Sequence, residues 1–233
     1  MEFIIHTQMK YSNITSLEDF YASLSGSDLV EKISQYLLNR ISPEETTLVL
    51  GCGDPYLNKL DKLDKMNESG NERLFYAIPS GYKISRWPAI RPFQTVVADE
   101  KNLPFLSYSF DKVIVVNFFE FSKHSRQTLN EISRCLKSNG SLIVISLNKS
   151  MLFRKIKRIR NSITEIVACL NSKSFILKRV FEVGEKSFHE IEPSSPLLLK
   201  TAQIFYDMVV LDTSREIPAE EPVFDLQEAL SVP

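Results

Sequence analysis

Short apolar runs rich in β-branched residues recur along the chain between residues 46 and 146. They are bounded by glycine, proline or polar turn residues, a pattern typical of strands that are buried on both faces. Between the fourth and fifth runs, residues 125–137 place Leu129, Ile132 and Leu136 on one helical stripe, and Asn139-Gly140 is expected to close that helix. The predicted strands are residues 46–50, 74–78, 95–98, 112–116 and 141–146.

Residues 16–40 carry apolar positions at helical spacing. The spacing is interrupted at residues 25–28, where a glycine is a poor interior residue and Asp28 offers a cap, so two short helices are predicted. A further helix is predicted from residue 55 to about residue 66. Strands that alternate with helices indicate parallel strands joined by right-handed crossovers, which is an α/β layered sheet.

The C-terminal third of the chain is less regular. Residues 150–170 look helical, and residues 175–183 and 207–212 have the pattern of further strands. After residue 215 the chain has five acids, no bases and three prolines, which is typical of a solvated, disordered tail. The predicted organisation is an N-terminal helical leader (1–45), an α/β domain (46–215) and an acidic tail (216–233).

Composition and charge narrow the class of protein. Of 233 residues, 43% are hydrophobic, in keeping with one soluble globular domain. A net charge of −1 excludes attraction of the whole chain to nucleic acid or membrane, although a local contact is still allowed. Three widely spaced cysteines, no apolar run near the ~20 residues of a membrane helix and an N-terminus without a basic region favour a cytoplasmic protein with no disulfide framework.

One segment departs from this charge balance. From Arg154 to Arg160 the chain holds five bases in seven positions. On a helix these could contact RNA phosphates or an anionic surface. A solvated helix face with Ile156 and Ile159 packed inward is the interpretation we favour, because the run lacks the interleaved aromatic residues that strengthen an RNA-binding assignment.

The loop after the first predicted strand has the pattern of a ligand loop. It reads Gly51-Cys52-Gly53-Asp54-Pro55 and leads into a predicted helix. Glycines let the backbone approach a ligand closely, and amides at a helix start favour a negatively charged group. Asp99 and Asn117 follow the third and fourth strands, so they should lie at the same edge of the sheet, where ligands bind in open α/β folds. The alternative is a tight turn without a ligand.

Two positions argue against the nicotinamide dinucleotides as ligands, and failure to bind NADH would end the hypothesis of a nicotinamide oxidoreductase. Their fingerprint needs a third glycine three residues after the second, where this chain has Tyr56. It also needs an acid on the next strand, but that strand ends Ala-Ile-Pro-Ser at residues 77–80.

Four segments, in order and at matching spacing, resemble motifs of the class I S-adenosylmethionine-dependent methyltransferases. The match covers roughly residues 46–148 and looks closest to the methyltransferase type 11 group, in a bacterial subgroup with Pro-Tyr-Leu after the first motif's glycines, here Pro55 to Leu57. No single motif is specific, but the ordered set is. The matching segments are Leu48–Pro55, Ala98–Phe105, Ser109–Ile114 and Glu131–Leu142.

The resemblance implies a Rossmann-like fold: a mostly parallel, seven-stranded sheet with an antiparallel final strand, flanked by helices. S-adenosylmethionine would lie across the strand ends, with its amino-acid part facing Gly51, Cys52, Gly53 and Asp54. Ile78 falls near the ribose position. Asp99 would bond the adenine amino group with Glu100 beside it, and Asn117 and Phe118 would lie under the methyl-donating end.

Two positions depart from the family pattern. The family usually has an acid two residues before the first glycine, where this chain has Val49, and another acid near Ile78 that grips the ribose hydroxyls. Losing the ribose contact would cost ~1.5–3 kcal/mol, or roughly 10–100-fold in affinity. Two hypotheses follow: a methyltransferase acting on an unidentified small-molecule or macromolecular acceptor, or a methyltransferase-fold protein that serves as a binding or scaffold module.

No catalytic base is assigned, since a base is needed only when the acceptor must lose a proton. Glu120 and His124 are the nearest candidates, and for each the simpler interpretation is a surface residue at a helix start. We interpret Cys52 as a packing residue. The three histidines are scattered along the chain, so no metal site is predicted.

Overall fold

The computed structural model describes residues 17–51, 73–80, 95–147, 161–184, 187–192 and 208–215. Four helices are described: α2 (Leu17–Ala22), α3 (Leu24–Leu38), α5 (Ser125–Cys135) and α6 (Ile163–Asn171). The strands are β1 (Thr47–Gly51), β2 (Leu74–Pro79), β3 (Thr95–Ala98), β4 (Phe110–Val116), β5 (Leu136–Leu147), β6 (Phe175–Gly184), β7 (Ser187–Ile191) and β8 (Met208–Arg215).

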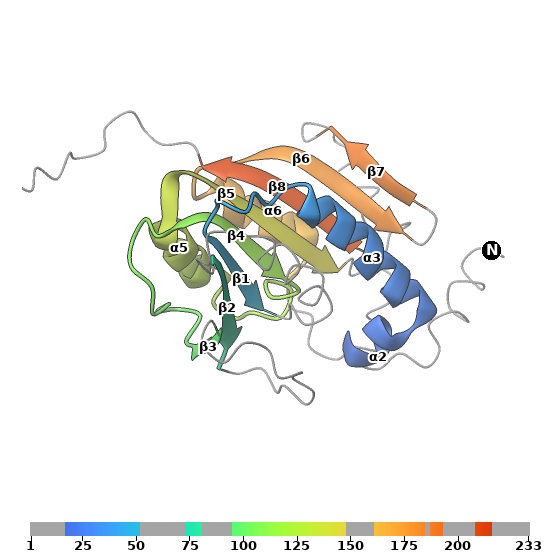
Figure 1. Ribbon diagram of the computed structural model, residues 1–233, viewed down its shortest axis with the longest axis horizontal. Helices are drawn as coiled ribbons and strands as arrows, with labels where there is room; N and C mark the ends of the chain where they lie inside the picture. The colour runs from blue at the N-terminus through green and yellow to red at the C-terminus, as the bar shows by residue number, and fades with distance from the viewer. Residues whose placement is uncertain are drawn as a thin grey trace, which may run out of the picture.

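The strands form one sheet in the order β3-β2-β1-β4-β5-β8-β6-β7 (Figure 1). The first five are parallel, and β8, β6 and β7 each run antiparallel to the strand before them in this order. The predicted mostly parallel sheet flanked by helices is confirmed. The prediction of seven strands is wrong, because the described residues form eight. The additional strand is β7, which pairs with the outer side of β6 from Val180↔Ile191 to Gly184↔Ser187. Its short, partly polar sequence carries little strand signal.

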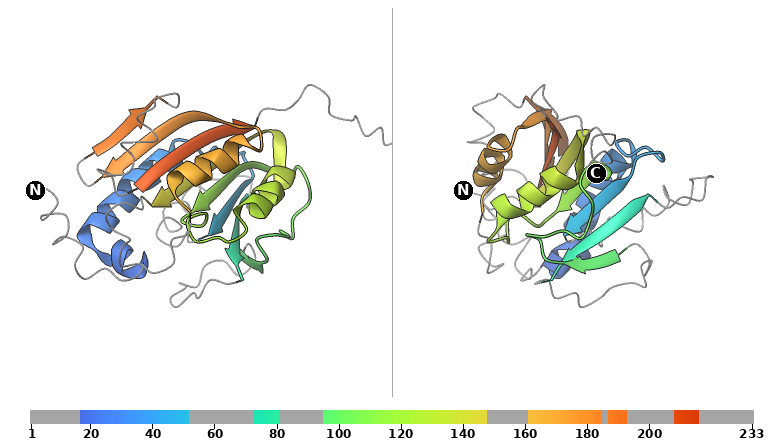
Figure 2. Two further views of the ribbon diagram at one scale, coloured as in Figure 1. Left: turned by 180° about the vertical axis from the view of Figure 1, so that it is seen from behind. Right: turned by 90° about the vertical axis from the view of Figure 1, so that its left-hand side faces the viewer.

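Helices cover both faces of the sheet, giving three layers (Figure 2). On one face α2 and α3 bury Phe20, Leu29 and Ile33 against alternate strand residues such as Val49. On the other face α5 and α6 pack against Leu48 and its counterparts. Because successive residues of a strand point to opposite faces, a strand covered on both sides is apolar throughout. This is why the first strands could be located from the sequence.

The break in the N-terminal helices lies before the predicted one. α2 ends at Ala22, and Ser23 caps α3 by accepting a hydrogen bond from the Gly26 amide at 3.1 Å. Residues 25–28 are therefore helical, and Asp28 instead pairs with Lys32. A Cβ on Gly26 would lie 2.0 Å from the Phe20 carbonyl oxygen. The glycine thus permits close packing of the two helices and does not mark the break.

The end of α5 also differs from the prediction. The helix stops at Cys135, and Leu136 is already extended and paired with Phe110 of β4. The next regular pair is Lys112↔Ser141, so Asn139 and Gly140 lie in an irregular stretch of β5. Pairing with β4 takes these residues into the sheet, where the local sequence alone indicated a helix end.

Buried charges fasten α3 and the segment after it to the sheet. Asp212 of β8 is buried, accepts a hydrogen bond from the Tyr36 hydroxyl at 2.8 Å and pairs with Arg40 at 2.7 Å. Lys112 of β4 pairs with Glu45 and donates to the Arg40 carbonyl oxygen. These contacts hold the N-terminal helices on the sheet. The division into leader, domain and tail stays a prediction, and residues 216–233 lie outside the described part.

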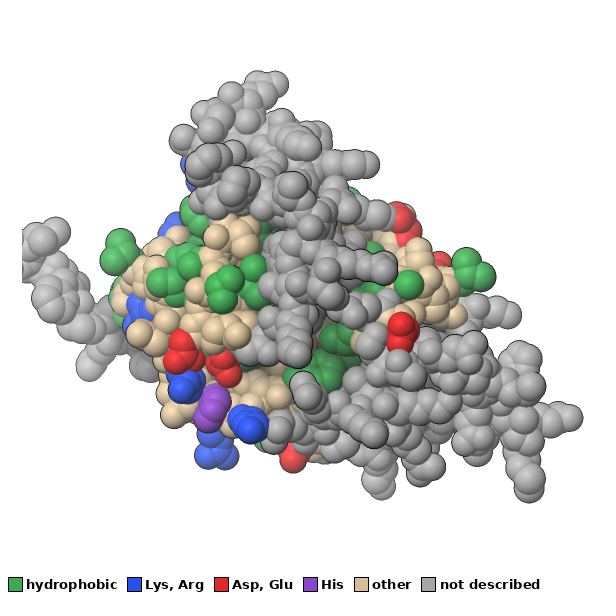
Figure 3. Space-filling view, turned by 90° about the horizontal axis from the view of Figure 1, so that it is seen from below, with side chains coloured by type: hydrophobic (Ala, Val, Ile, Leu, Met, Phe, Trp, Pro, Cys, Tyr) green, Lys and Arg blue, Asp and Glu red, His purple; other side chains and the backbone are tan. Residues whose placement is uncertain are grey.

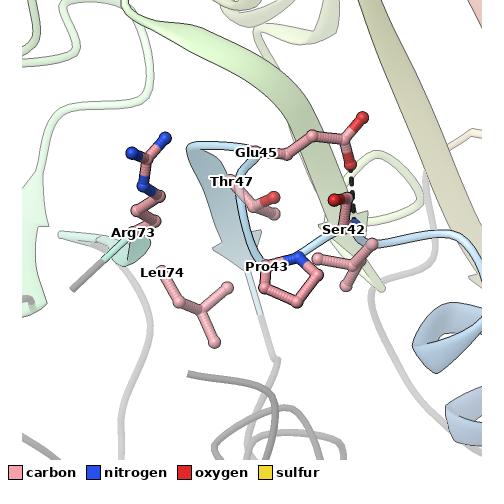
Figure 4. A pocket seen from close by; sticks show the side chains of 7 residues that line it. Ser42, Pro43, Glu45, Thr47, Arg73 and Leu74 are labelled. Carbon is pink, nitrogen blue, oxygen red and sulfur yellow. Dashed lines mark hydrogen bonds between the residues drawn. The ribbon is translucent and has the colours of Figure 1, made fainter. Parts of the chain in front are cut away.

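A small hollow lies at the amino ends of β1 and β2 (Figure 4). Its volume is about 20 Å³, enough for a water molecule but not for a ligand. It lies at the edge of the sheet opposite the predicted ligand loop. Its lining includes Ser42, Pro43, Glu45, Thr47, Arg73 and Leu74.

Candidate active site

The strand order reverses between β1 and β4, which lie side by side in the centre of the sheet. They are paired to the end of β1, where Gly51 lies opposite Val116. At the carboxyl ends of β1 and β4 the backbone takes positive φ angles: Gly51 has a φ of 103° and Asn117 a φ of 46°. In open α/β sheets such a switch point, at the carboxyl ends of the strands, is where ligands bind.

Gly51 is fixed at this position by conformation and by space. A Cβ there would lie 2.4 Å from the Val116 carbonyl oxygen and 3.0 Å from Cβ of Phe118. Only glycine combines this positive φ with so close an approach. Cys52, Gly53 and Asp54 lie outside the described residues, so their roles stay predictions.

Asn117 lies at the centre of a buried polar network. Its Nδ2 donates to Oε1 of Glu120 at 3.0 Å, and its Oδ1 accepts a hydrogen bond from the Tyr21 hydroxyl of α2. Its own amide donates to the Ile145 carbonyl oxygen at 2.9 Å. Phe118, the next residue, is buried. The sequence predicted Asn117 and Phe118 at this edge but gave Tyr21 no role, because its contact spans 96 positions of the chain.

Glu120 is fully buried, so its interpretation as a surface residue is wrong. Oε1 also accepts a hydrogen bond from the Leu147 amide at 2.7 Å, whereas Oε2 has no hydrogen-bond partner among the described residues. The Ser146 hydroxyl is close enough to favour the charged carboxylate but makes no hydrogen bond of good geometry. Burial raises the pKa of Glu120, against the hydrogen bonds from Asn117 and Leu147. Glu120 therefore acts as an internal support. His124 is exposed beside α5, as expected.

The other half of the edge is formed by β2 and β3. Ile78 is buried, and Pro79 pairs with Ala98, so no acid stands at the end of β2. Asp99 follows β3 with its side chain half exposed, and its Oδ1 accepts a hydrogen bond from the Lys101 amide at 3.0 Å. Glu100 beside it is half-buried. β3 and β4 are three strand spacings apart, so Asp99 and Asn117 are separated by roughly 14 Å across the sheet.

A clamp from α5 holds the loop that follows Asp99. Arg134 and Glu131 form an ion pair at 2.7 Å, and Oε2 of Glu131 accepts from the Leu103 amide at 2.9 Å. The Arg134 guanidinium donates to the carbonyl oxygens of Leu103 and Phe105 at 3.0 and 2.8 Å. The segments Ala98–Phe105 and Glu131–Leu142 are thus joined by hydrogen bonds that fix the backbone beside the end of β3.

Replacing Glu131 by glutamine should lower the free energy of unfolding by about 1–2 kcal/mol at pH 7, since the charge-assisted bonds to Arg134 are lost. The hydrogen bond from Arg134 lowers the pKa of Glu131 below its ordinary value of 4.5. A lowered folded-state pKa means that the stability is present above pH 4.5 and is lost as the pH falls through the folded pKa. Urea unfolding at pH 7 and pH 3.5 should show the difference shrinking at the lower pH. The exposed Glu190 replaced by glutamine serves as control, and an equal loss in that variant would contradict the assignment.

Within the described residues no three His, Cys, Asp or Glu side chains converge as metal ligands would, and no helix is long and apolar enough to cross a membrane. Cys135 is buried and Cys169 is half-buried, and both are free thiols. The cluster at this edge thus consists of the β1 and β4 ends, the Tyr21–Asn117–Glu120 network and the exposed Asp99.

Solved structures share this fold. A S-adenosylmethionine-dependent methyltransferase from Aquifex aeolicus is 14% identical, with 80% of this chain and 97% of that chain covered and a TM-score of 0.52. A protein of Thermotoga maritima described as a possible histamine N-methyltransferase is 16% identical over 91% and 99% of the two chains, with a TM-score of 0.53. A geranyl diphosphate C-methyltransferase from Streptomyces coelicolor A3(2) is 11% identical over 80% and 77%, with a TM-score of 0.54.

Sequence comparison agrees. Residues 66–144 match the family model described as "Methyltransferase domain". Among curated proteins, an uncharacterized protein of Methanocaldococcus jannaschii is 38% identical over 60 residues, which is 26% of each chain, so the match spans about a quarter of that relative. The chain thus shares the fold of S-adenosylmethionine-dependent methyltransferases, and its residues 66–144 are similar to the methyltransferase domain family. Its placement in the subgroup with Pro-Tyr-Leu at residues 55–57 stays a prediction.

Proposed function

We propose that this protein transfers a methyl group from S-adenosylmethionine to an acceptor, and that it binds the donor along the edge from β3 to β4. The observation that supports this most strongly is the pair of left-handed turns at Gly51 and Asn117, which open the sheet at its switch point. An extended ligand that starts over these turns would reach Asp99.

The residues at this edge fit such a donor, with one exception. Gly51 brings bare backbone to the edge, Phe118 offers a buried apolar floor, and the half-exposed Asp99 offers an acceptor for an amino group. The exception is the apolar Ile78 at the ribose position. When bound, S-adenosylmethionine supplies an activated methyl group. The chain's own part is to orient the donor and exclude water.

Replacing Asp99 by asparagine should weaken the binding of S-adenosylhomocysteine about tenfold, because a charge-assisted hydrogen bond becomes a neutral one. Isothermal titration calorimetry measures this directly. The matched control is Glu190 replaced by glutamine, an exposed carboxylate on β7, which should leave the affinity unchanged. Absence of binding to the unaltered protein at millimolar ligand would contradict the proposal.

A second function, that of a non-catalytic binding module, is favoured by two apolar positions. Val49 is 2% exposed and lies in the core under α3, and Ile78 is 5% exposed, so neither position supplies the family's usual acid. Release of labelled methyl groups from the donor to any acceptor would exclude this alternative.

The fold does not identify the methyl acceptor. One structural relative is described as a possible histamine N-methyltransferase and another as a geranyl diphosphate C-methyltransferase. An RNA or anionic surface contact through Arg154 to Arg160 stays a prediction, since these residues lie outside the described part.

A further inference from the structure

A groove with a volume of about 490 Å³ lies between the start of α5 and the flank of α6. Its size is that of a small-molecule site. It lies beyond the carboxyl end of β4, where the chain runs from Asn117 to the first turn of α5. Its lining includes Lys123, His124, Arg126, Asn161, Glu165 and Cys169.

The groove carries two cations that no described residue neutralises. Lys123 and Arg126 are exposed, and among the described residues neither makes an ion pair or a hydrogen bond through its side chain. The one acid in the lining, Glu165, is engaged at the start of α6, where its Oε2 accepts from the Ser162 amide at 2.6 Å and from the Ser162 hydroxyl at 2.9 Å. Figure 3 shows basic side chains gathered around a histidine on this face, with acidic ones alongside.

The start of α5 adds to the positive potential. This helix has no side-chain cap at His124 and no acid in its first turn. Its first amides therefore lack a side-chain acceptor, and the helix dipole places partial positive charge at the same end of the groove. An anion entering the groove would face both these amides and the two cations.

The groove is held in shape and is tied to the candidate active site. Nδ2 of Asn161 lies 2.6 and 2.9 Å from the carbonyl oxygens of Phe119 and Ser122 and 3.0 Å from the Ser125 hydroxyl, so its two protons are shared among three acceptors. The Asn161 backbone amide donates to the Glu120 carbonyl oxygen at 3.2 Å. One side chain thus fixes the loop from Asn117 to α5 against α6, which gives a preorganised site.

We propose that this groove binds the phosphate group of a small phosphorylated molecule. Planar guanidinium, ammonium and helix-start amides together recognise phosphate oxygens, and the volume suits a single small ligand. Because the groove continues the loop that begins at Asn117, we take this molecule to be the methyl acceptor, a step that rests on the proposed function.

The test is calorimetric titration of the full chain with inorganic pyrophosphate at low ionic strength. Replacing Lys123 and Arg126 together by glutamine should weaken pyrophosphate binding about tenfold. The control replaces Lys178 and Arg179 of β6, an exposed lysine and arginine outside the groove, and should change nothing. Pyrophosphate should also slow alkylation of Cys169, read by peptide mass spectrometry, because that thiol lines the groove.

Affinity for S-adenosylhomocysteine, measured on the same samples, separates the two proposals. The variant with Lys123 and Arg126 replaced should keep its affinity for S-adenosylhomocysteine unchanged. If the unaltered protein binds pyrophosphate but not S-adenosylhomocysteine, the methyltransferase function is refuted, whereas the phosphate site in the groove stands. Equal pyrophosphate binding by this variant and the unaltered protein would overturn the assignment of the groove as a phosphate site. So would binding of a ten-nucleotide RNA without any binding of pyrophosphate, since the groove would then belong to a macromolecular surface.

Discussion

Replacing Glu120 by alanine is expected to lower the free energy of unfolding by about 2–5 kcal/mol. The carboxyl is fully buried and accepts hydrogen bonds from the Leu147 amide and from Nδ2 of Asn117. Without it both donors stay buried and unpaired, and Asn117 loses the contact that orients its carboxamide toward Tyr21. Urea unfolding monitored by circular dichroism measures the loss.

Glutamine at the same position should behave differently, and the difference depends on pH. Burial raises the pKa of Glu120 above its ordinary value of 4.5, which means that the folded state favours the neutral carboxyl. For a raised pKa the stability is full below pH 4.5 and is lost as the pH rises toward the folded-state pKa. Glutamine keeps the Oε1 acceptor and cannot ionise. The glutamine variant should therefore gain stability relative to the unaltered protein between pH 5 and 8.

The pH profile, and not the size of either effect, decides whether Glu120 is a buried neutral support. Thr128 replaced by valine is a suitable control, because it is buried in α5 and loses a single hydrogen bond, to the His124 carbonyl oxygen, with no titrating group. A stability difference between the glutamine variant and the unaltered protein that stays constant from pH 4 to pH 8 would contradict the raised pKa.

The parallel half of the sheet could be predicted because its strands are short, apolar and covered on both faces. Thr95–Ala98 was located to the residue, and Thr47–Gly51 to within one residue. Helix ends were harder. Gly26 and Gly140 both looked like helix breakers, yet each is a place where backbone or side chains pack too closely for a Cβ. A glycine needed for close packing and a glycine needed for a turn are indistinguishable in sequence.

The positions of the candidate residues at the sheet edge could be predicted where one strand is followed directly by the residue concerned. Gly51, Asp99 and Asn117 each follow an apolar run directly, and parallel strands bring their ends to one edge. Tyr21 and Asn161 were missed because their contacts join distant elements. One signal for the burial of Glu120 was present: it stands among Phe118, Phe119 and Phe121, where an exposed carboxylate is out of place. The resemblance to methyltransferases supplied roles for residues that pattern alone could only place.

Replacing Gly51 by alanine is expected to cost about 3 kcal/mol or more in the free energy of unfolding. A left-handed backbone costs an ordinary residue about 1–2 kcal/mol, and the new Cβ would also meet the Val116 carbonyl oxygen at 2.4 Å. That oxygen belongs to the strand paired with β1, so it can move only if the pair parts. Asparagine tolerates positive φ better than alanine but carries the same Cβ. If the contact with the Val116 carbonyl oxygen dominates, the alanine and asparagine variants should unfold at similarly low urea concentrations. A stable asparagine variant would show that the positive φ alone explains the need for glycine at this position.

Gly140 replaced by alanine is the matched control for that experiment. Its φ is not positive, and its new Cβ would meet Cδ2 of Leu136, a side-chain end, at 2.8 Å and the Lys137 carbonyl oxygen at 2.9 Å, which is a longer approach than the 2.4 Å at Gly51. Its cost should be smaller than that at Gly51, and it should leave S-adenosylhomocysteine binding intact because Gly140 lies in the first part of β5, toward the opposite edge of the sheet. The Gly51 variant should lose that binding even at 10 °C in the absence of urea. Circular dichroism under the same conditions measures the fraction of the variant that is folded. A folded Gly51 variant with unchanged affinity would mean that the switch point shapes the sheet but does not hold the donor.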